Sequence, residues 1–328
     1  MKFEDVENAR LNYINERKKV RRKATRITLS IYLPLLLVVV IVNYSVLANL
    51  FLSLLSSSLQ NLFFLLIPIL MMLFFAILIP YVIIAIVVSS STADDAVKYK
   101  KAYKGYSVGQ QLERTFSNLK YSHDVGLDRQ ILIDNGMINT GDRYLSNDLT
   151  TGKYKDVDFA QADVHIEKEY KDGDGDTQYE TVFKGRYLVF KFPKKFNSRM
   201  MLTHSGSPKS EINPKDRNKI LQYMQTESTE FNKAFAMYAE DGVEALYILT
   251  PDFMEQAQEL GLSHNDNVSI YFADNTMIIG INDGGDIFEP PSPEKPIDEK
   301  IELEKVGQEI NLVTHIIDSL KLNRKVST

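Results

Sequence analysis

From Ile27 to Ala93 the chain contains no Asp, Glu, Lys or Arg, and this run restricts the possible folds more than any other feature. It holds two apolar stretches, residues 27–52 and 62–88, joined by the short uncharged segment 53–61. Each stretch exceeds the roughly 20 apolar residues that cross about 30 Å of hydrocarbon. A cleaved signal peptide is shorter and is not followed at once by a second span. The sequence therefore predicts a transmembrane helical hairpin over residues 27–88.

Lysine and arginine flank this hairpin on both sides. Residues 1–26 hold nine Lys or Arg and four Asp or Glu, which gives 9 − 4 = +5, and four lysines lie between residues 98 and 104. Such residues tend to stay on the cytoplasmic side of a span. The connecting segment 53–61 has none. We therefore expect a two-pass protein of a bacterial inner membrane, with both termini in the cytoplasm.

The basic segment 1–26 has a second expected role at the membrane surface. Cationic side chains at the cytoplasmic leaflet attract anionic lipid headgroups, by about 1 kcal/mol each. The residues expected to make this contact are Arg17, Lys18, Lys19, Arg21, Arg22 and Lys23. A simpler alternative is that these residues only set the topology, and the two roles are compatible.

Charge also excludes several classes of function. The hairpin contains no ionisable Asp, Glu, Lys, Arg or His, whereas proton relays and ion paths usually need one, so it is predicted to be a plain anchor that could also self-associate. The net charge of the chain is −5, so the part after residue 26 carries −5 − 5 = −10. This acidic body argues against nucleic-acid binding. The chain has no cysteine, which excludes disulfides, thiolate metal sites and cysteine nucleophiles.

Residues 98–288 are predicted to form a cytoplasmic α+β domain with a mostly antiparallel sheet. Apolar alternation with β-branched and aromatic residues indicates strands, and capping residues mark helix ends. We expect helices at residues 106–121, 127–138, 213–224 and 250–261. We expect strands at 156–170, 179–192, 199–204 and 230–241, and a hairpin over 268–282 that turns at Asp274-Asn275.

Proline-rich residues 289–296, "EPPSPEKP", are predicted to be a stiff linker, and residues 297–322 an amphipathic helix. Apolar residues of this helix recur at spacings of three and four, the pattern of a helix-packing seam. The seam consists of Leu303, Val306, Ile310, Val313, Ile317 and Leu320. We favour packing of the seam against the body or a partner protein over self-association.

Several stretches resemble a known family. They are "FKGRYLVFKF", "EFNKAFAMYAEDGVEALYILTPDFMEQ", "IYFADNTMIIGIN" followed by "DIFEP", and "IIDSLKL". With the hairpin, they resemble a bacterial membrane family of uncharacterised proteins, domain-of-unknown-function family 3137. The resemblance implies a two-span membrane protein with a cytoplasmic α+β domain. It implies no activity and no catalytic residues.

The stretch "KEYKDGDGDTQYE" is the strongest candidate for a metal site. Asp172, Asp174 and Asp176 alternate with glycines and match the first three ligand positions of a calcium-binding EF-hand loop. The Gly and Glu that such a loop needs at positions 6 and 12 are absent, and the flanks are predicted strands. A tight hairpin turn is therefore favoured, with weak cation binding as the alternative. The acidic stretch 282–286 is interpreted in the same way.

The remaining catalytic patterns are weak. "SNLK" at residues 117–120 fits S-x-x-K without the K-T-G that accompanies it in serine acyl enzymes. His204 and Ser205 are adjacent on a predicted strand and so face opposite ways. The five histidines lack metal-ligand spacing, and no P-loop or G-x-G-x-x-G occurs. We predict no catalytic residue and no cofactor.

These observations favour a membrane-anchored, non-catalytic cytoplasmic domain that acts as a protein-interaction or regulatory module. Its expected partners are the lipid bilayer and either another protein or a second copy of the chain. One alternative is an enzyme, for example a hydrolase, with an unrecognised site built from scattered carboxylates. The other is a lipid-binding or envelope-maintenance protein that acts through the hairpin and the basic segment.

Overall fold

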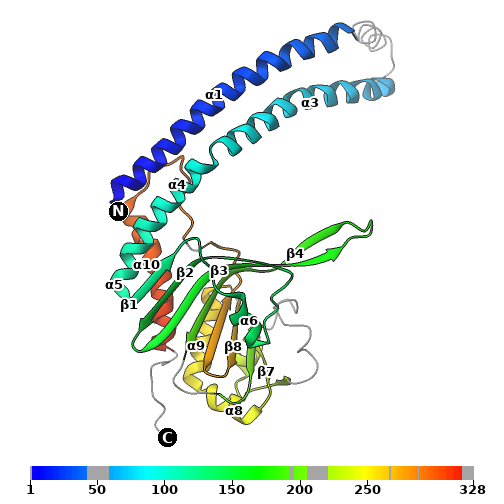
Figure 1. The fold of residues 1–328 in the computed structure, drawn as a ribbon. Helices are drawn as coiled ribbons and strands as arrows, with labels where there is room; N and C mark the ends of the chain where they lie inside the picture. Colours follow the sequence, from blue (N-terminus) through cyan, green and yellow to red (C-terminus); the bar gives the residue numbers. More distant parts are fainter. Residues whose placement is uncertain are drawn as a thin grey trace. The chain divides into compact units, whose positions relative to one another are not determined.

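A computed structural model describes residues 2–42, 59–191, 196–204, 221–265, 267–286 and 288–319 (Figure 1). The chain divides into two compact units. The first consists of residues 1–103 and 290–297, and the second of residues 104–289 and 298–328. Most of the predicted loop 53–61 and of the predicted helix 213–224, together with Leu320 of the seam, lie outside the described residues. The described end of that predicted helix is wrong, because residues 222–224 form a strand that pairs with residues 237–239.

In its described residues, the first unit contains three helices. They are α1 Phe3–Val42, α3 Leu59–Ser91 and α4 Ala93–Tyr103. α1 runs without interruption from the basic segment into the apolar stretch, and it packs against both α3 and α4. Within the described residues, one helical window, Phe74–Ser91, is apolar and long enough to cross a membrane. A long apolar helix is therefore established here, and the two-span hairpin stays a prediction.

The second unit opens with short elements that correct one prediction. The expected helix 106–121 is instead the π-helical turn η1 Lys104–Val108, helix α5 Gly109–Thr115 and strand β1 Ser117–Ser122. β1 pairs antiparallel with strand β2, Arg143–Tyr154. β2 itself was not predicted, because its residues are mostly polar and show no apolar alternation. Pairing with distant strands therefore decides the structure of both segments.

In the part of the second unit that the structure describes, nine strands form one sheet, and every pair of neighbouring strands is antiparallel. The order is β1-β2-β3-β4-β9-β8-β5-β7-β6. The strands after β2 are β3 Val157–Lys171, β4 Thr177–Lys191, β5 Met200–His204, β6 Gln222–Met224, β7 Phe235–Ala239, β8 Val268–Ala273 and β9 Thr276–Ile281. The predicted antiparallel sheet is thus confirmed, as are the strands at 156–170, 179–192 and 199–204 and the hairpin turning after Ala273.

The predicted strand 230–241 is wrong in its first half. Residues Thr229–Ala234 form helix α7, because the hydroxyl of Ser228 accepts the backbone N–H of Phe231 at 3.2 Å and caps the helix. Only the second half enters the sheet, as β7. Helix α8, Gly242–Ile248, follows directly and was not predicted.

Helices cover both faces of the sheet. Helix α6, Arg129–Asn135, belongs to one apolar core, and helices α9 Pro251–Ser263 and α10 Glu299–Ser319 belong to the other. α6 lies within the predicted range 127–138 and ends at Asn135, because Gly136 after it has φ 75° and caps the helix. α9 begins at the predicted Thr250-Pro251 cap but continues two residues past the predicted end at Gly261.

The seam of the C-terminal helix lies in the core of its own unit. Val306, Ile310, Val313 and Ile317 are at most 3% exposed and belong to the same apolar core as the sheet. Leu303, one turn earlier, is only partly buried. The four buried seam residues therefore pack against the body, which is one of the alternatives that the sequence favours.

Candidate functional site

Lys104 is the centre of the candidate site, because a buried lysine needs a partner for its charge. It begins η1, and only 1% of it is exposed. Its ammonium contacts a carboxylate oxygen of Asp148 and lies 3.5 Å from Oδ1 of Asp286. π-Helical turns are rare and occur frequently at functional sites. The turn thus brings a cation into the interior of the sheet unit.

Asp148 reaches this cation because β2 is irregular at that point. The pairing of β2 with β3 shifts register between Asn147 and Thr150, and Asp148 itself has φ 58°. Such irregularities redirect side chains relative to the regular pleat. The carboxylate accepts hydrogen bonds from the Tyr121 hydroxyl at 2.7 Å and from the Asn147 amide at 2.6 Å. With Lys104, it therefore has three donors.

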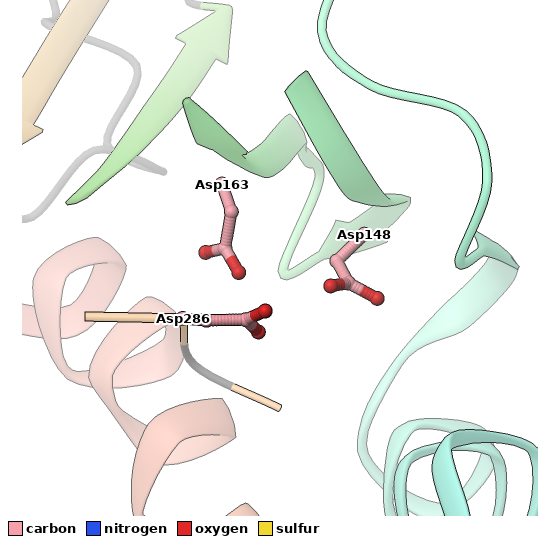
Figure 2. A group of neighbouring side chains, drawn as sticks. All are labelled: Asp148, Asp163 and Asp286. Carbon is pink, nitrogen blue, oxygen red and sulfur yellow. The ribbon is translucent and has the colours of Figure 1, made fainter. Parts of the chain in front are cut away.

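Two more carboxylates approach Asp148, as Figure 2 shows. Asp163 lies in β3, and Asp286 follows β9. One oxygen from each of the three side chains lies within 4.8 Å of the other two. Among the residues that the structure describes, no other set of three His, Cys, Asp or Glu side chains comes together in this way. We refer to Lys104, Asp148, Asp163 and Asp286 as the lysine–aspartate cluster.

The environment of this cluster changes the pKa of the Tyr121 hydroxyl. Burial raises the pKa of the Tyr121 hydroxyl, and the negative charge of Asp148 raises it further. The hydroxyl therefore keeps its proton at neutral pH and remains a hydrogen-bond donor to Asp148. Three carboxylates lie close together here and the ammonium contacts two of them, so neutral donors such as this hydroxyl supply further hydrogen bonds that buried carboxylates need.

The cluster limits what chemistry could occur here. Three carboxylate oxygens are ligands that Mg²⁺ or Ca²⁺ accepts, but the Lys104 ammonium already supplies a positive charge among them. That ammonium is bound by Asp148 and closed to solvent, so it is not positioned to attack a substrate. What the geometry supports directly is an electrostatic attachment of η1 to the sheet.

A second buried cation lies on β4, the strand that pairs with β3. Arg186 of β4 is paired in register with Asp163 of β3, and it is 3% exposed. Its guanidinium contacts Glu309 of α10 and lies 3.4 Å from Asp283. Burial lowers the pKa of His264 nearby, and the charge of Arg186 adds to this shift. Arg186 therefore connects the sheet to the C-terminal helix.

The predicted turn at Asp172 is a turn in the structure. Oδ1 of Asp172 accepts the backbone N–H groups of Asp174 at 3.1 Å and Asp176 at 2.9 Å, and Gly175 has φ 87°. These backbone hydrogen bonds lower the pKa of the Asp172 carboxyl. The carboxylate is thus engaged in closing the β3–β4 hairpin, and nothing in this geometry gathers the three aspartates around a cation.

The acidic stretch 282–286 was interpreted as a turn, and the structure gives it a larger role. Asp283 and Asp286 are partners of the two buried cations, Arg186 and Lys104. Sequence reasoning missed Lys104, which appeared only as one of several lysines flanking the hairpin. The available signal was weak: Lys104 is followed directly by the first glycine of the chain and by "YSV".

The predicted membrane-surface residues lie on α1. Arg17, Lys18, Lys19, Arg21, Arg22 and Lys23 are all exposed. A surface hollow of about 810 Å³ is lined by Asn15, Lys18, Lys19, Arg22, Lys23, Arg26 and Ile27. Cations therefore gather immediately before the apolar stretch begins.

Comparison with known proteins supports the family but no activity. Residues 181–322 match the family described as "Protein of unknown function (DUF3137)". The predicted resemblance is confirmed over these residues, which do not include the predicted hairpin. No curated protein matches the chain.

One solved structure is similar in part. It is described as the crystal structure of the mycobacterial trehalose monomycolate transport factor A, TtfA. The match covers 70% of this chain and 98% of that one, at 9% sequence identity and a TM-score of 0.35. A similarity at this level supports no conclusion about this chain.

Proposed function

We propose, for a chain whose residues 181–322 belong to domain-of-unknown-function family 3137, that the protein is a two-pass protein of a bacterial inner membrane. Residues 27–88 anchor it as a helical hairpin, and both termini lie in the cytoplasm. The α+β domain carries out no catalysis and binds another protein.

The exposed apolar surface of α1 and α3 is the main support for a membrane anchor. Beginning at Ile27, large apolar side chains of both helices are exposed, with Ile31 at 66% and Ile77 at 73%. Soluble proteins rarely leave apolar patches of more than a few hundred Å² uncovered. Each Å² of apolar surface removed from water contributes about 25 cal/mol. A bilayer would cover this surface at no cost to protein packing.

The cations of α1 support the orientation. The hollow lined by Lys18, Lys19, Arg22 and Arg26 ends at Ile27, where the apolar stretch starts. Basic residues in this position suit the headgroup layer of the cytoplasmic leaflet, which carries anionic lipid. This arrangement also favours, as a secondary role, weak binding to anionic membranes.

Cysteine labelling tests the topology, because the native chain has no cysteine. Single cysteines replace Ser57 in the predicted external segment and Asp174 in the β3–β4 turn. In intact cells, a membrane-impermeant maleimide should label the first variant only. After lysis it should label both, which controls for reactivity. Labelling of Asp174→Cys in intact cells would contradict the proposed orientation.

Helix α8 favours a protein-binding role for the domain. Val243, Leu246 and Tyr247 are spaced to share one helix face, and they are 69%, 50% and 78% exposed. The acids Asp241 and Glu244 lie on the same helix turn, and the body as a whole is acidic. An apolar centre beside negative charge fits a partner protein that offers an apolar pocket with a basic rim.

In-cell photocrosslinking tests this face. A photoreactive amino acid at position 247 should give one discrete adduct in intact cells, and Leu246→Ser should weaken it about tenfold or more. The matched control is Val125→Ser, which alters an equally exposed apolar residue elsewhere, at 50%. An adduct pattern that is unaffected by Leu246→Ser, or that contains only lipid, would remove support for a protein partner.

The lysine–aspartate cluster favours the enzyme alternative, because it gathers carboxylates around a buried amine. An enzyme of this kind would turn over a substrate, and Asp163→Asn would abolish the turnover while the fold persists. We expect no such activity from the purified full chain against ester, phosphoester and peptide substrates. Turnover that one substitution abolishes would establish the alternative.

A further inference from the structure

The proline-rich segment 290–297 lies within the first unit, beside the beginning of α1 and beside α4 (Figure 1). The sequence predicts these residues to be a stiff linker. In the structure, main-chain carbonyl groups of the segment accept hydrogen bonds from both helices. The hydroxyl of Tyr99 in α4 donates to the carbonyl of Pro291 at 3.1 Å. Arg10 of α1 donates from Nη1 to the carbonyl of Pro293 at 2.7 Å.

The side chains of the two donors are buried and are held by other residues of α1 and α4. Arg10 is 5% exposed and Tyr99 is 3% exposed, so nine-tenths or more of each side chain is buried. Glu7, one turn earlier on α1, accepts from Arg10 Nε at 2.9 Å and holds the guanidinium in place. The ring of Tyr13 stacks on that of Tyr99, with centroids 6.5 Å apart. The donors are therefore positioned by contacts that do not involve the proline-rich segment.

These contacts recognise the main chain of the segment. Both donors bind carbonyl oxygens, and proline has no N–H group that would have to be satisfied at a helix surface. Pro290, Pro291 and Pro293 are half-buried, whereas Ser292 and Glu294 point outward and are exposed. Many peptide-binding domains bind extended proline-rich segments through aromatic side chains and hydrogen-bond donors. The site should therefore require proline and tolerate changes at the outward positions.

The residues of the segment are only half-buried or exposed, so its attachment can open locally. An ion pair joins Arg17 to Glu294 at 2.5 Å, and its side chains are 45% and 58% exposed. Exposed ion pairs contribute little to stability. Segments with few buried contacts open locally long before a protein unfolds as a whole.

We propose that α1 and α4 form a binding site for a proline-rich segment, and that residues 290–297 of the same chain are its ligand, docked as a releasable strap. Both ends of the strap continue into the unit that contains the sheet. Docking is thus a second attachment of that unit to the helices α1 and α4, in addition to the peptide link after Tyr103. This inference does not depend on the membrane topology or on the partner of α8.

Spin-label mobility tests the docking in the full chain in detergent micelles. A nitroxide is attached to a cysteine that replaces the outward-facing Ser292. We expect a restricted spectrum in the parent chain and a mobile component, increased on the order of tenfold, in Arg10→Gln and in Tyr99→Phe. The matched control is Lys19→Gln, which removes an exposed cation of α1 that does not contact the segment. Equal spectra in all four proteins would overturn the proposal.

A peptide added in trans tests whether the site recognises proline. The fluorescent peptide Glu-Pro-Pro-Ser-Pro-Glu-Lys-Pro is titrated into a variant in which Pro290, Pro291 and Pro293 are replaced by serine. We expect saturable binding that Arg10→Gln weakens about tenfold, and at least tenfold weaker binding to the parent chain, whose site is filled. Absence of binding, or binding that Arg10→Gln leaves unchanged, would refute the site.

Mixed copies separate docking within one chain from exchange between chains. Chains that carry Glu294→Cys are mixed with chains that carry Arg17→Cys, the two positions that the ion pair joins, and a short bis-maleimide linker is added. Cross-linking should occur when both cysteines are on one chain and not between the two kinds of chain. Efficient cross-linking between chains would show that the segment docks on a second copy, and the strap within one chain would be rejected.

Discussion

Replacing Lys104 by methionine should reveal how much of the stability of the sheet unit depends on one buried charge. Methionine keeps the length and apolar stem of the side chain, so the change removes the ammonium with little loss of packing. Lys104 is 1% exposed, and its main partner Asp148 is also 1% exposed. Breaking a buried pair by removing one partner costs about 3–5 kcal/mol, since the other charge remains buried without compensation.

The structure places this substitution well within that range. Oxygens of Asp148, Asp163 and Asp286 lie within 4.8 Å of one another, and the lysine is the cation among them. We therefore expect Lys104→Met to lower the free energy of unfolding by about 4 kcal/mol. That is a large share of the roughly 5–15 kcal/mol that stabilises a typical domain.

The assay is denaturant unfolding of the full chain in detergent, followed by the circular dichroism of the sheet. Lys300→Met serves as the control, because the Lys300 side chain is 86% exposed and its loss should cost less than about 0.5 kcal/mol. The double variant Lys104→Met with Asp148→Asn should recover at least about 1 kcal/mol relative to Lys104→Met alone. If Lys104→Met costs no more than Lys300→Met, the cluster does not hold η1 to the sheet, and the reasoning is refuted.

Three further predictions concern single contacts. Gly185→Ala should lower the free energy of unfolding by about 1–3 kcal/mol, because a Cβ there would lie 2.0 Å from the carbonyl oxygen of Ile281. Chemical denaturation measures this free energy. The control is Gly173→Ala, whose Cβ would meet no atom within 4 Å. Thr250→Ala should cost about 1 kcal/mol through loss of the hydroxyl that accepts the N–H of Phe253 at 3.2 Å, and an unchanged thermal midpoint would contradict the cap. Burial lowers the pKa of the His264 imidazole below its usual value near 6.5, so the unfolded state binds the proton more readily than the folded state. The stability that depends on this group is therefore present above about pH 6.5 and is lost as the pH falls. The free energy of unfolding should fall less steeply with acid in His264→Gln than in the parent chain.

Local patterns in the sequence predicted much of the fold. β3 and β4 were predicted from their aromatic and β-branched residues, and α9 was predicted from Thr250, Pro251 and the acids of its first turn. These signals act between residues that are close in sequence, so a single stretch contains them. The same holds for the seam of α10, of which Val306, Ile310, Val313 and Ile317 face the core at the expected spacing.

Other elements follow no local pattern. β2 is largely polar, and its residues become a strand because β1 and β3 pair with them on either side. The first half of the predicted strand 230–241 became α7, since a single capping hydroxyl on Ser228 outweighed the β propensity of its aromatic residues. Propensity is a weak preference, and pairing or capping energies of about 1 kcal/mol are enough to override it.

The sequence by itself determined the apolar run, the sign of the charges around it and the spacing of the core-facing residues within single helices and strands. Each of these depends only on neighbours along the chain. Only the tertiary structure decided which charges meet. Lys104 lies 44 residues from Asp148 and 182 from Asp286, and Arg10 lies 283 residues from Pro293. A buried cation selects its partner by proximity in a medium of low dielectric constant, and proximity over such separations is set by the order of strands in the sheet and by helix packing.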